Sequence, residues 1–503
     1  MQAIDWAVIA GYATLVLVIG WRVGRGHQTT DELFLGGRRI PVWAAFLSMV
    51  ATELSAATFI GVPVASYGGD WAYLQLAFGA LAGKIVVATW FISRYHQLRL
   101  VTVYGFLDQR FGRRAELLGS WFFLVGRLFA SGARLFIGAV AFAIVTDLDM
   151  VASIVIVGLI AGVYTFAGGI RAVIWTDTLQ GTVFIVAAAT ALVVLSGRID
   201  GGFDGMWASA QQAGKTQVFH FPPLFDGGAA WSTFQENYLG ATSAFFVSLF
   251  GGFFLVLASH GTDQDMVQRL LTTRDGRKGG AALIGSAITN FPLSALFLFL
   301  GTGLWAFYRP DLGTFAAYDI SDIARIFPTF VLHEIPVGIR GLIFAGLFAA
   351  AMSSMDSALN ALATTWVVNI RRDVTDPAEK LRITRRATIV FGLLLIGAAL
   401  ACVAWYRSLA SSGFGLIDLA LGSMTVLYGG LLGAFLVGLA TGRGSERSVT
   451  AGMIISGLLG IVLLLQPLYL DGRTELAWIW WIILGTAISF SIGVLGRGEE
   501  RST

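Results

Sequence analysis

The sequence Ala51-Thr52-Glu53-Leu54-Ser55, followed by Gly61 and Pro63, interrupts an otherwise apolar part of the chain. It places a polar run with a carboxylate inside an apolar segment, residues 42–66, that is long enough to cross a bilayer. Glycine and proline are poor helix formers, so the stretch predicts a helix that unwinds partway across. Irregular backbone at that depth must pack against protein or line a cavity. The alternative is a proline kink with Glu53 extending toward the interface.

Apolar segments of similar length occur along the whole chain. A bilayer core requires about 20 apolar residues per helical crossing. The pattern predicts thirteen crossings, near residues 5–23, 42–66, 71–95, 115–146, 150–168, 172–197, 234–262, 279–307, 337–369, 387–407, 414–440, 448–468 and 475–496. The chain is therefore expected to be an all-α, multi-pass membrane protein.

The composition agrees with a membrane protein. Hydrophobic residues make up 56% of the chain and charged residues 13%, against about 25% charged residues in a typical soluble domain. The net charge of +3 arises from loops such as residues 371–386. It therefore indicates the orientation of the chain in the membrane, and no nucleic-acid partner is expected. The single cysteine, Cys402, excludes an internal disulfide and a cysteine-based metal site. The first span has no basic residues before it and is expected to be a retained helix.

Basic residues predict the orientation of the chain. Most of the 34 lysines and arginines fall in loops on one side of the predicted spans, and cytoplasmic loops retain such residues. The N-terminus is therefore expected outside and the C-terminus in the cytoplasm of a bacterial-type inner membrane. The longest loop, residues 198–233, is too short for a catalytic or signalling domain. We expect a transporter that works as a monomer and has no enzymatic activity and no organic cofactor.

The ninth span carries polar residues at mid-depth, where function is the default interpretation. Ser353, Asp356 and Ser357 are spaced at i, i+3 and i+4 and share one helix face. Hydroxyl and carboxylate oxygens suit a small hard cation. The alternative is a face of small residues that lets helices pack closely. Asp356 favours the ion site.

Three further charged residues fall within predicted spans. Asp177 is predicted either to bind an ion or to cap the sixth span, where a carboxylate is favourable. Arg127 lies roughly 18 Å from the cytoplasmic end of the fourth span. It is expected to pair with Glu53 or another acid, or to bind an anionic substrate. Lys84 has the same two interpretations.

The topology adds a repeat. Spans two to six begin inside and end outside, so spans seven to eleven run the opposite way. If the two quintets share a fold, they are related by a pseudo-twofold axis in the membrane plane, as in LeuT-type transporters, and the first helix of each quintet then carries a break. The breaks are expected near residues 52–55 and near Gly251-Gly252. The predicted units are residues 1–41, 42–197 and the external loop 198–233, then the second repeat 234–440 and two final helices in 441–503.

Several separate segments resemble the sodium:solute symporter family. They are Asp31-Glu32-Leu33-Phe34-Leu35-Gly36-Gly37-Arg38, Ser55-Ala56-Ala57-Thr58-Phe59-Ile60-Gly61, Gly168-Gly169 with Trp175-Thr176-Asp177-Thr178-Leu179-Gln180, Thr262-Asp263-Gln264 with Gln268-Arg269, and the segment 350–360. The resemblance covers most of the chain. It implies import of a small organic solute coupled to sodium, by alternating access between outward-open and inward-open states.

The resemblance also implies ion sites. The shared sodium site would use the backbone carbonyls of Ala51, Leu54 and Ala350 and the hydroxyls of Ser353 and Ser354. Some members have a second sodium site. By similarity it would fall on Asp177, Ser353, Ser357 and position 356, where those members tend to have serine and this chain has Asp356. A second carboxylate could strengthen that site or carry a proton.

The substrate is less constrained. At the apparent equivalents of the polar sugar-binding residues of galactose transporters the chain has Thr58, Ala77 and Val256, which disfavours such a sugar. Sialic acid members place an arginine where this chain has Ala130, with Arg127 and Arg134 one turn to either side. An organic anion is favoured and a sugar remains an option. The predicted substrate-wall positions are Glu53, Thr58, Gln75, Arg127, Ser259 and His260.

Three alternatives stay open beside a sodium symporter. A proton-coupled symporter is one alternative, because the carboxyl groups of Asp356, Asp177 and Glu53 could carry a proton. A sensor would need a partner to supply a signalling domain. A channel would need a continuous polar stripe along several helices, whereas the polar residues form isolated clusters.

Overall fold

The structure, a computed structural model, describes residues 1–24, 29–165, 169–224, 230–308, 323–408, 416–470 and 475–498, and Gly168 lies outside them. The described residues are organised in helices. These are α1 (Ala3–Val23), α2 (Thr30–Leu35), α3 (Val42–Glu53), α4 (Val62–Gly68), α5 (Gln75–Val86), α6 (Ile92–Gln97), α7 (Gly105–Arg110), α8 (Arg113–Thr146), α9 (Met150–Thr165), α10 (Gly169–Ser196), α11 (Gly202–Gln212), α12 (Ala230–Phe234), α13 (Phe245–Gly261), α14 (Gln264–Leu271), α15 (Gly276–Tyr308), α16 (Ile326–Glu334), α17 (Ile339–Thr365), α18 (Pro377–Ser408), α19 (Leu416–Ala440), α20 (Glu446–Leu464), α21 (Gln466–Tyr469) and α22 (Trp478–Leu495).

The number of continuous spans is lower than the sequence predicts. Among the described residues, 11 helices are long and apolar enough to cross a membrane, or 12 if the bent pair Asp31–Arg38 and Val42–Glu53 is one span. Two of the thirteen predicted spans are not among these helices, because their continuous helical segments are too short to cross a membrane. Residues 42–66 divide into α3 and α4, and the apolar part of α9 covers only Met150–Gly162.

The predicted break in the second span is confirmed. Helix α3 ends at Glu53, and Leu54 has an extended backbone (φ −77°, ψ 104°). The chain then resumes as a π-helical turn, Ala57–Gly61, that leads into α4. The backbone N–H of Ser55 donates to the hydroxyl of Thr58 at 3.4 Å, so a side chain partly replaces the lost helical hydrogen bond.

The second break lies elsewhere than predicted. Helix α13 runs without interruption through Gly251-Gly252 and ends at Gly261, and α14 begins at Gln264. The two glycines serve packing instead: a Cβ on Gly252 would lie 2.4 Å from the carbonyl oxygen of Leu76 in α5. Within the predicted span 234–262 the helix is interrupted at residues 241–244, between the π-helical turn Gln235–Gly240 and α13. A further break lies at Thr262-Asp263, where the Asp263 side chain caps α14 by accepting from the Asp265 N–H.

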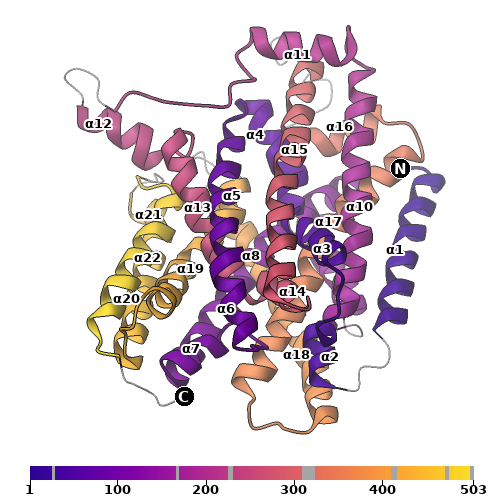
Figure 1. Ribbon diagram of the computed structural model, residues 1–503. Coiled ribbons are helices and arrows are strands. Elements are labelled where there is room, and N and C mark those ends of the chain that lie inside the picture. Colours follow the sequence, from indigo (N-terminus) through magenta and orange to yellow (C-terminus); the bar gives the residue numbers. More distant parts are fainter. Residues whose placement is uncertain are drawn as a thin grey trace.

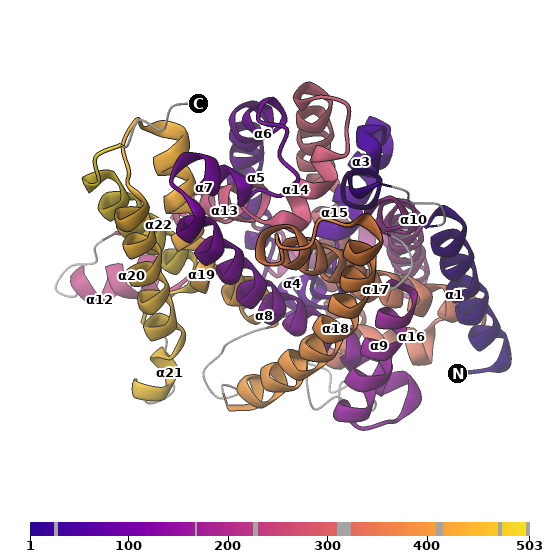
Figure 2. The ribbon, with the colours of Figure 1, turned by 90° about the horizontal axis from the view of Figure 1, so that it is seen from below.

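The helices form one bundle with α17 inside it (Figure 1). Of the most apolar window of α17, 94% is buried within the protein, whereas the value for α1 is 17%. Viewed from below, α1 lies at one edge of the bundle and α20 and α22 lie at the opposite edge (Figure 2). Polar residues on α17 are therefore enclosed by protein, which is where ion sites of membrane proteins are found.

Helix α1 is attached to the start of α17 through a buried carboxylate. The Asp5 side chain accepts hydrogen bonds from the N–H groups of Gly338 and Gly341 at 2.8 and 3.2 Å and from Nε of Arg340 at 3.2 Å. A carboxylate at a helix N-terminus satisfies unpaired N–H groups and complements the helix dipole. Asp5 thus fixes one end of the central helix.

A bulkier residue at Gly252 should separate α5 from α13. Overpacking of this kind typically costs about 1–3 kcal/mol, so Gly252→Ala should lower the thermal unfolding midpoint of the purified protein. Gly397→Ala on the exposed face of α18 is the control, because nothing lies within 4 Å of its Cβ position. Equal midpoints for the two variants would contradict the close packing.

Candidate functional site

The break in α3 faces the middle of α17. The Ser353 hydroxyl lies 3.4 Å from the carbonyl oxygen of Ala51 and donates to Oδ1 of Asp177 at 2.8 Å. The neighbouring Ser354 hydroxyl donates to the Ala350 carbonyl at 3.1 Å. All of these residues are buried. The structure thus brings the broken helix α3, the central helix α17 and a carboxylate of α10 to one place.

This arrangement has the chemistry of a small-cation site. The last carbonyls of a helix have no partner within the helix, so the break leaves those of Ala51 and Leu54 available. Carbonyl oxygens at helix ends and hydroxyl oxygens are ligands that transporters use for sodium. The five predicted ligands lie on the two segments that meet here, and Leu54 is the extended residue that directly follows α3.

Asp177 is part of this site and does not cap its helix. It lies more than two turns inside α10, which begins at Gly169, so the capping alternative is wrong. Its Oδ2 accepts from the Ser48 hydroxyl at 2.7 Å and from Thr52 at 3.4 Å, both on α3. With Ser353 on its other oxygen, Asp177 connects the two halves of the candidate sodium site.

A guanidinium group also contacts Asp177. Nη2 of Arg269, on α14, donates to Oδ2 of Asp177 at 3.0 Å and to the hydroxyl of Ser357 on α17. Nε donates to Ser48 at 3.0 Å and Nη1 donates to Oδ1 of Asp265 at 2.6 Å. Arg269 is fully buried. One side chain therefore connects α14 to α3, α10 and α17.

Asp356 lies beside this group. Its Oδ1 accepts from the backbone N–H of Ser357 at 2.7 Å, and its Oδ2 lies 3.5 Å from the Thr176 hydroxyl on α10. Like Asp177, it is buried. The predicted second ion site, Asp177, Asp356 and Ser357, is thus gathered at the contact between α10 and α17.

Arg127 belongs to a second ion-pair group. Its Nη1 donates to Oδ2 of Asp263 at 3.1 Å and its Nη2 donates to Oδ2 of Asp265. The hydroxyl of Tyr428, on α19, donates to Asp263 at 2.5 Å. The ion-pair interpretation of Arg127 is the one that the structure supports, with acids from the α13–α14 break as partners rather than Glu53.

Glu53 is at the centre of a third polar cluster. Its Oε2 accepts from Nζ of Lys84 on α5 at 2.6 Å, and its Oε1 accepts from the hydroxyl of Ser286 on α15 at 3.0 Å. Nε2 of His260 on α13 lies 3.2 Å from Oε1, and Nδ1 of His260 lies 2.8 Å from the Ser259 hydroxyl. Of the predicted substrate-wall residues, Glu53, Ser259 and His260 therefore lie together, directly before the α3 break.

Two other predicted substrate-wall residues lie apart from this cluster. The Gln75 amide donates to the carbonyls of Ala72 and Ser243 and accepts from the N–H of His220, so it attaches the loop after α11 to the start of α5. Thr58 lies beyond the break and is partly exposed.

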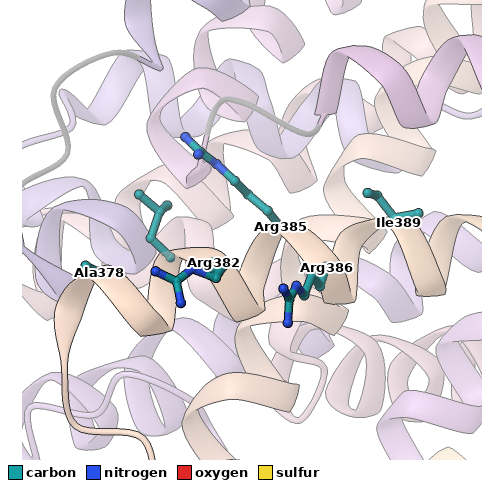
Figure 3. Close-up of a pocket in the computed structure, with 6 residues that line it drawn as sticks. Ala378, Arg382, Arg385, Arg386 and Ile389 are labelled. Carbon is teal, nitrogen blue, oxygen red and sulfur yellow. The ribbon is translucent and has the colours of Figure 1, made fainter.

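One surface pocket is rich in arginine. It lies along the start of α18 and is lined by Ala378, Leu381, Arg382, Arg385, Arg386 and Ile389 (Figure 3). In this view Arg385 extends to one side of the helix and Arg382 and Arg386 to the other. All three arginines line this one pocket, which gives it a positively charged wall. It belongs to the basic loop region that is predicted to be cytoplasmic.

Several residues of the site have no clear signal in the sequence. Asp265 lies in a short helix whose polar residues resemble a solvent-exposed loop, although it is buried. Arg269, on the same helix, belongs to a segment that resembles the family, but its contact with Asp177 has no signal in the sequence. Ser286 and Tyr428 are single polar residues in apolar spans and are indistinguishable from packing residues. Only the long-range contacts between distant helices identify them.

The sequence and the fold of this chain are both similar to those of known proteins. The sequence pattern of the sodium:solute symporter family matches residues 33–456. The sodium/sialic acid symporter NanT of Aliivibrio fischeri is 30% identical over 98% of this chain and 92% of its own length. The sodium-coupled monocarboxylate transporter 1 of Homo sapiens is 26% identical over 92% and 74%, respectively. A substrate-bound, outward-open structure of a Na⁺-coupled sialic acid symporter superposes with a TM-score of 0.84, at 26% identity, over 99% of both chains. Mhp1, a nucleobase-cation-symport-1 family transporter, has a TM-score of 0.57 at 15% identity over 92% of this chain and 93% of its own, which shows a shared fold.

Removing one partner of the Glu53–Lys84 pair should destabilise the protein more than removing both. A buried charge left without its partner typically costs about 3–5 kcal/mol. Lys84→Met alone and Glu53→Gln alone should each lower the thermal unfolding midpoint, and the double variant should recover part of the loss. Additive losses in this double-mutant cycle would contradict a direct interaction.

Proposed function

This chain belongs to the sodium:solute symporter family and is a sodium-coupled solute symporter, and we propose that its solute is a small organic anion. We propose import by alternating access, with the N-terminus outside the cell membrane, the C-terminus in the cytoplasm and a single chain as the working unit. The observation that carries the ion-binding part is the meeting of the α3 break, Ser353 and Asp177.

Sodium would bind at the carbonyls of Ala51, Leu54 and Ala350 and the hydroxyls of Ser353 and Ser354. An ion there would hold the broken helix against the central helix. One sodium ion that moves down a potential of 100 mV supplies about 2.3 kcal/mol. A monovalent anion that moves with one sodium ion makes the transported pair electrically neutral, so a second sodium ion is needed before this electrical free energy drives accumulation, by roughly fifty-fold at 1.4 kcal/mol per factor of ten.

A second sodium would bind at Asp177, Asp356 and Ser357. Counted by direct ion pairs alone, the three carboxylates Asp177, Asp263 and Asp265 share two guanidinium groups, which leaves one formal negative charge without a direct partner. Arg134 interacts with Asp263 without forming an ion pair with it. Buried uncompensated charge is costly, which favours a monovalent cation at Asp177. Asp356 adds a further carboxylate to the same side of α17.

An anionic solute is supported by the chemistry of the Glu53 cluster. Lys84 is a buried cation whose partner, Glu53, lies directly before the break in α3. A solute carboxylate would compete with Glu53 for Lys84, and a sodium ion bound together with the solute would balance the negative charge that the solute adds. The names of the matched relatives, which include sialic acid and monocarboxylate transporters, point to the same solute class.

Ser353→Ala should weaken sodium coupling. The substitution removes a hydroxyl that touches both the Ala51 carbonyl and Asp177, so a higher sodium concentration should be needed for half-maximal uptake into proteoliposomes. Ser120→Ala is the matched control, because Ser120 is a buried serine that donates to its own helix at Glu116. An unchanged sodium dependence in Ser353→Ala would reject the assignment.

The solute class can be identified by thermal unfolding of the purified protein against small carboxylates, sugars and amino acids. A ligand at 100 times its dissociation constant stabilises a protein by about 2.7 kcal/mol. We expect a carboxylate to raise the unfolding midpoint in sodium chloride and to have little effect in choline chloride. Stabilisation by sugars alone would reject an anionic solute, and equal stabilisation in both salts would favour proton coupling.

A further inference from the structure

The side chain of Arg269 occupies the oxygens that a second cation would use. Its Nη2 donates to Asp177 and Ser357, which are two of the three residues of the proposed second sodium site. A guanidinium group and a sodium ion carry the same charge, and both are stabilised by these oxygens. They therefore cannot use Asp177 Oδ2 and Ser357 Oγ fully at the same time.

We propose that Arg269 is a tethered cation that competes with sodium for Asp177. The proposal rests on the sodium symport proposed above. When sodium binds, Nη2 leaves Asp177 and Ser357. When sodium leaves, Nη2 returns and keeps the buried carboxylate compensated. Arg269 is thus a positioning residue that sets sodium affinity through Asp177.

The tether is Asp265, which holds Arg269 from the other side. Nη1 of Arg269 donates both to Oδ1 of Asp265 at 2.6 Å and to its backbone carbonyl at 2.5 Å. Both residues lie on α14, one helical turn apart, so these contacts are local and persist when Nη2 is displaced. A stronger tether weakens the hold of Arg269 on Asp177 and thereby favours sodium.

The same tether connects the sodium site to the second break. Oδ2 of Asp265 accepts from Arg127 on α8, and Arg127 also pairs with Asp263, a residue of the break between α13 and α14. Displacement of Arg269 toward Asp265 redistributes charge in this network. His260, in the Glu53 cluster, lies at the end of α13 next to the same break. Sodium binding at Asp177 would in this way change the electrostatic environment of the proposed solute pocket.

Two substitutions should shift sodium affinity in opposite directions. Arg269→Gln removes the competitor and should lower the sodium concentration that gives half-maximal thermal stabilisation by about tenfold, the ratio equivalent to 1.4 kcal/mol. Arg269→Lys keeps a cation and should stay near the wild-type value. Asp265→Asn loosens the tether, so Arg269 should hold Asp177 more firmly. The sodium concentration that gives half-maximal thermal stabilisation, the sodium midpoint, should then rise.

Matched controls separate competition from a general change of charge. Arg134→Gln and Asp263→Asn make the same charge changes in the neighbouring group, and in the described structure neither side chain forms an ion pair or a hydrogen bond with Arg269. Competition predicts that each control shifts the sodium midpoint less than its counterpart at 269 or 265. Equal shifts in the paired variants, or no shift in Arg269→Gln, would overturn the proposal.

The same experiment distinguishes this proposal from the underlying one. If wild-type protein is not stabilised by sodium, the proposed sodium sites fail before Arg269 is tested. If Arg269→Gln does not fold, Asp265→Asn decides alone: a rise larger than that of Asp263→Asn supports competition, and an equal or smaller change rejects it.

Discussion

The structure depends on compensating one buried carboxylate, Asp177, in the middle of the helical bundle. A charge at that depth is costly unless it is paired or binds an ion. Asp177 obtains its partners from three directions: Ser48 on the broken helix, Ser353 on the central helix and Arg269 on α14. The three partners belong to three different segments of the bundle, α3, α17 and α14. The state of Asp177 is therefore coupled to the arrangement of those helices.

The break in α3 has a cost that these contacts offset. Ending a helix inside the membrane region leaves backbone carbonyls without intrahelical partners. A cation coordinated by the carbonyls of Ala51 and Leu54 would satisfy them, and Ser353 already lies beside Ala51. The same break places Glu53 where it meets Lys84 and His260. One interruption of the helix thus creates both an ion site and a polar cluster beside it.

Much of this architecture is predictable from the sequence, and the reason is local. Spans follow from runs of apolar residues, and the break in α3 follows from the polar run around Glu53 together with Gly61 and Pro63. The grouping of Ser353, Asp356 and Ser357 follows from helical periodicity. These features depend on residues that are close in the chain. The other residues of the predicted sodium site, Ala51, Leu54, Ala350 and Ser354, are predicted from the resemblance to the family.

The parts that sequence reasoning placed wrongly depend on contacts between distant segments. Gly251-Gly252 was predicted as a break, but the glycines allow α13 to approach Leu76 of α5, which is far away in the chain. Glycine marks either a bend or a close contact, and sequence alone does not separate the two. The partners of Arg127 are a similar case. Asp263 and Asp265 become neighbours of α8 only when α13 ends at Gly261.

The most direct test is whether sodium and solute raise the affinity of each other by the same factor. Sodium affinity would be measured by titration of the purified protein with and without saturating solute, and solute affinity with and without saturating sodium. If sodium organises the pocket by holding α3 against α17, linkage requires the two factors to be equal and greater than one. Sodium and solute affinities that are independent of each other would contradict an organisation of the solute pocket by sodium.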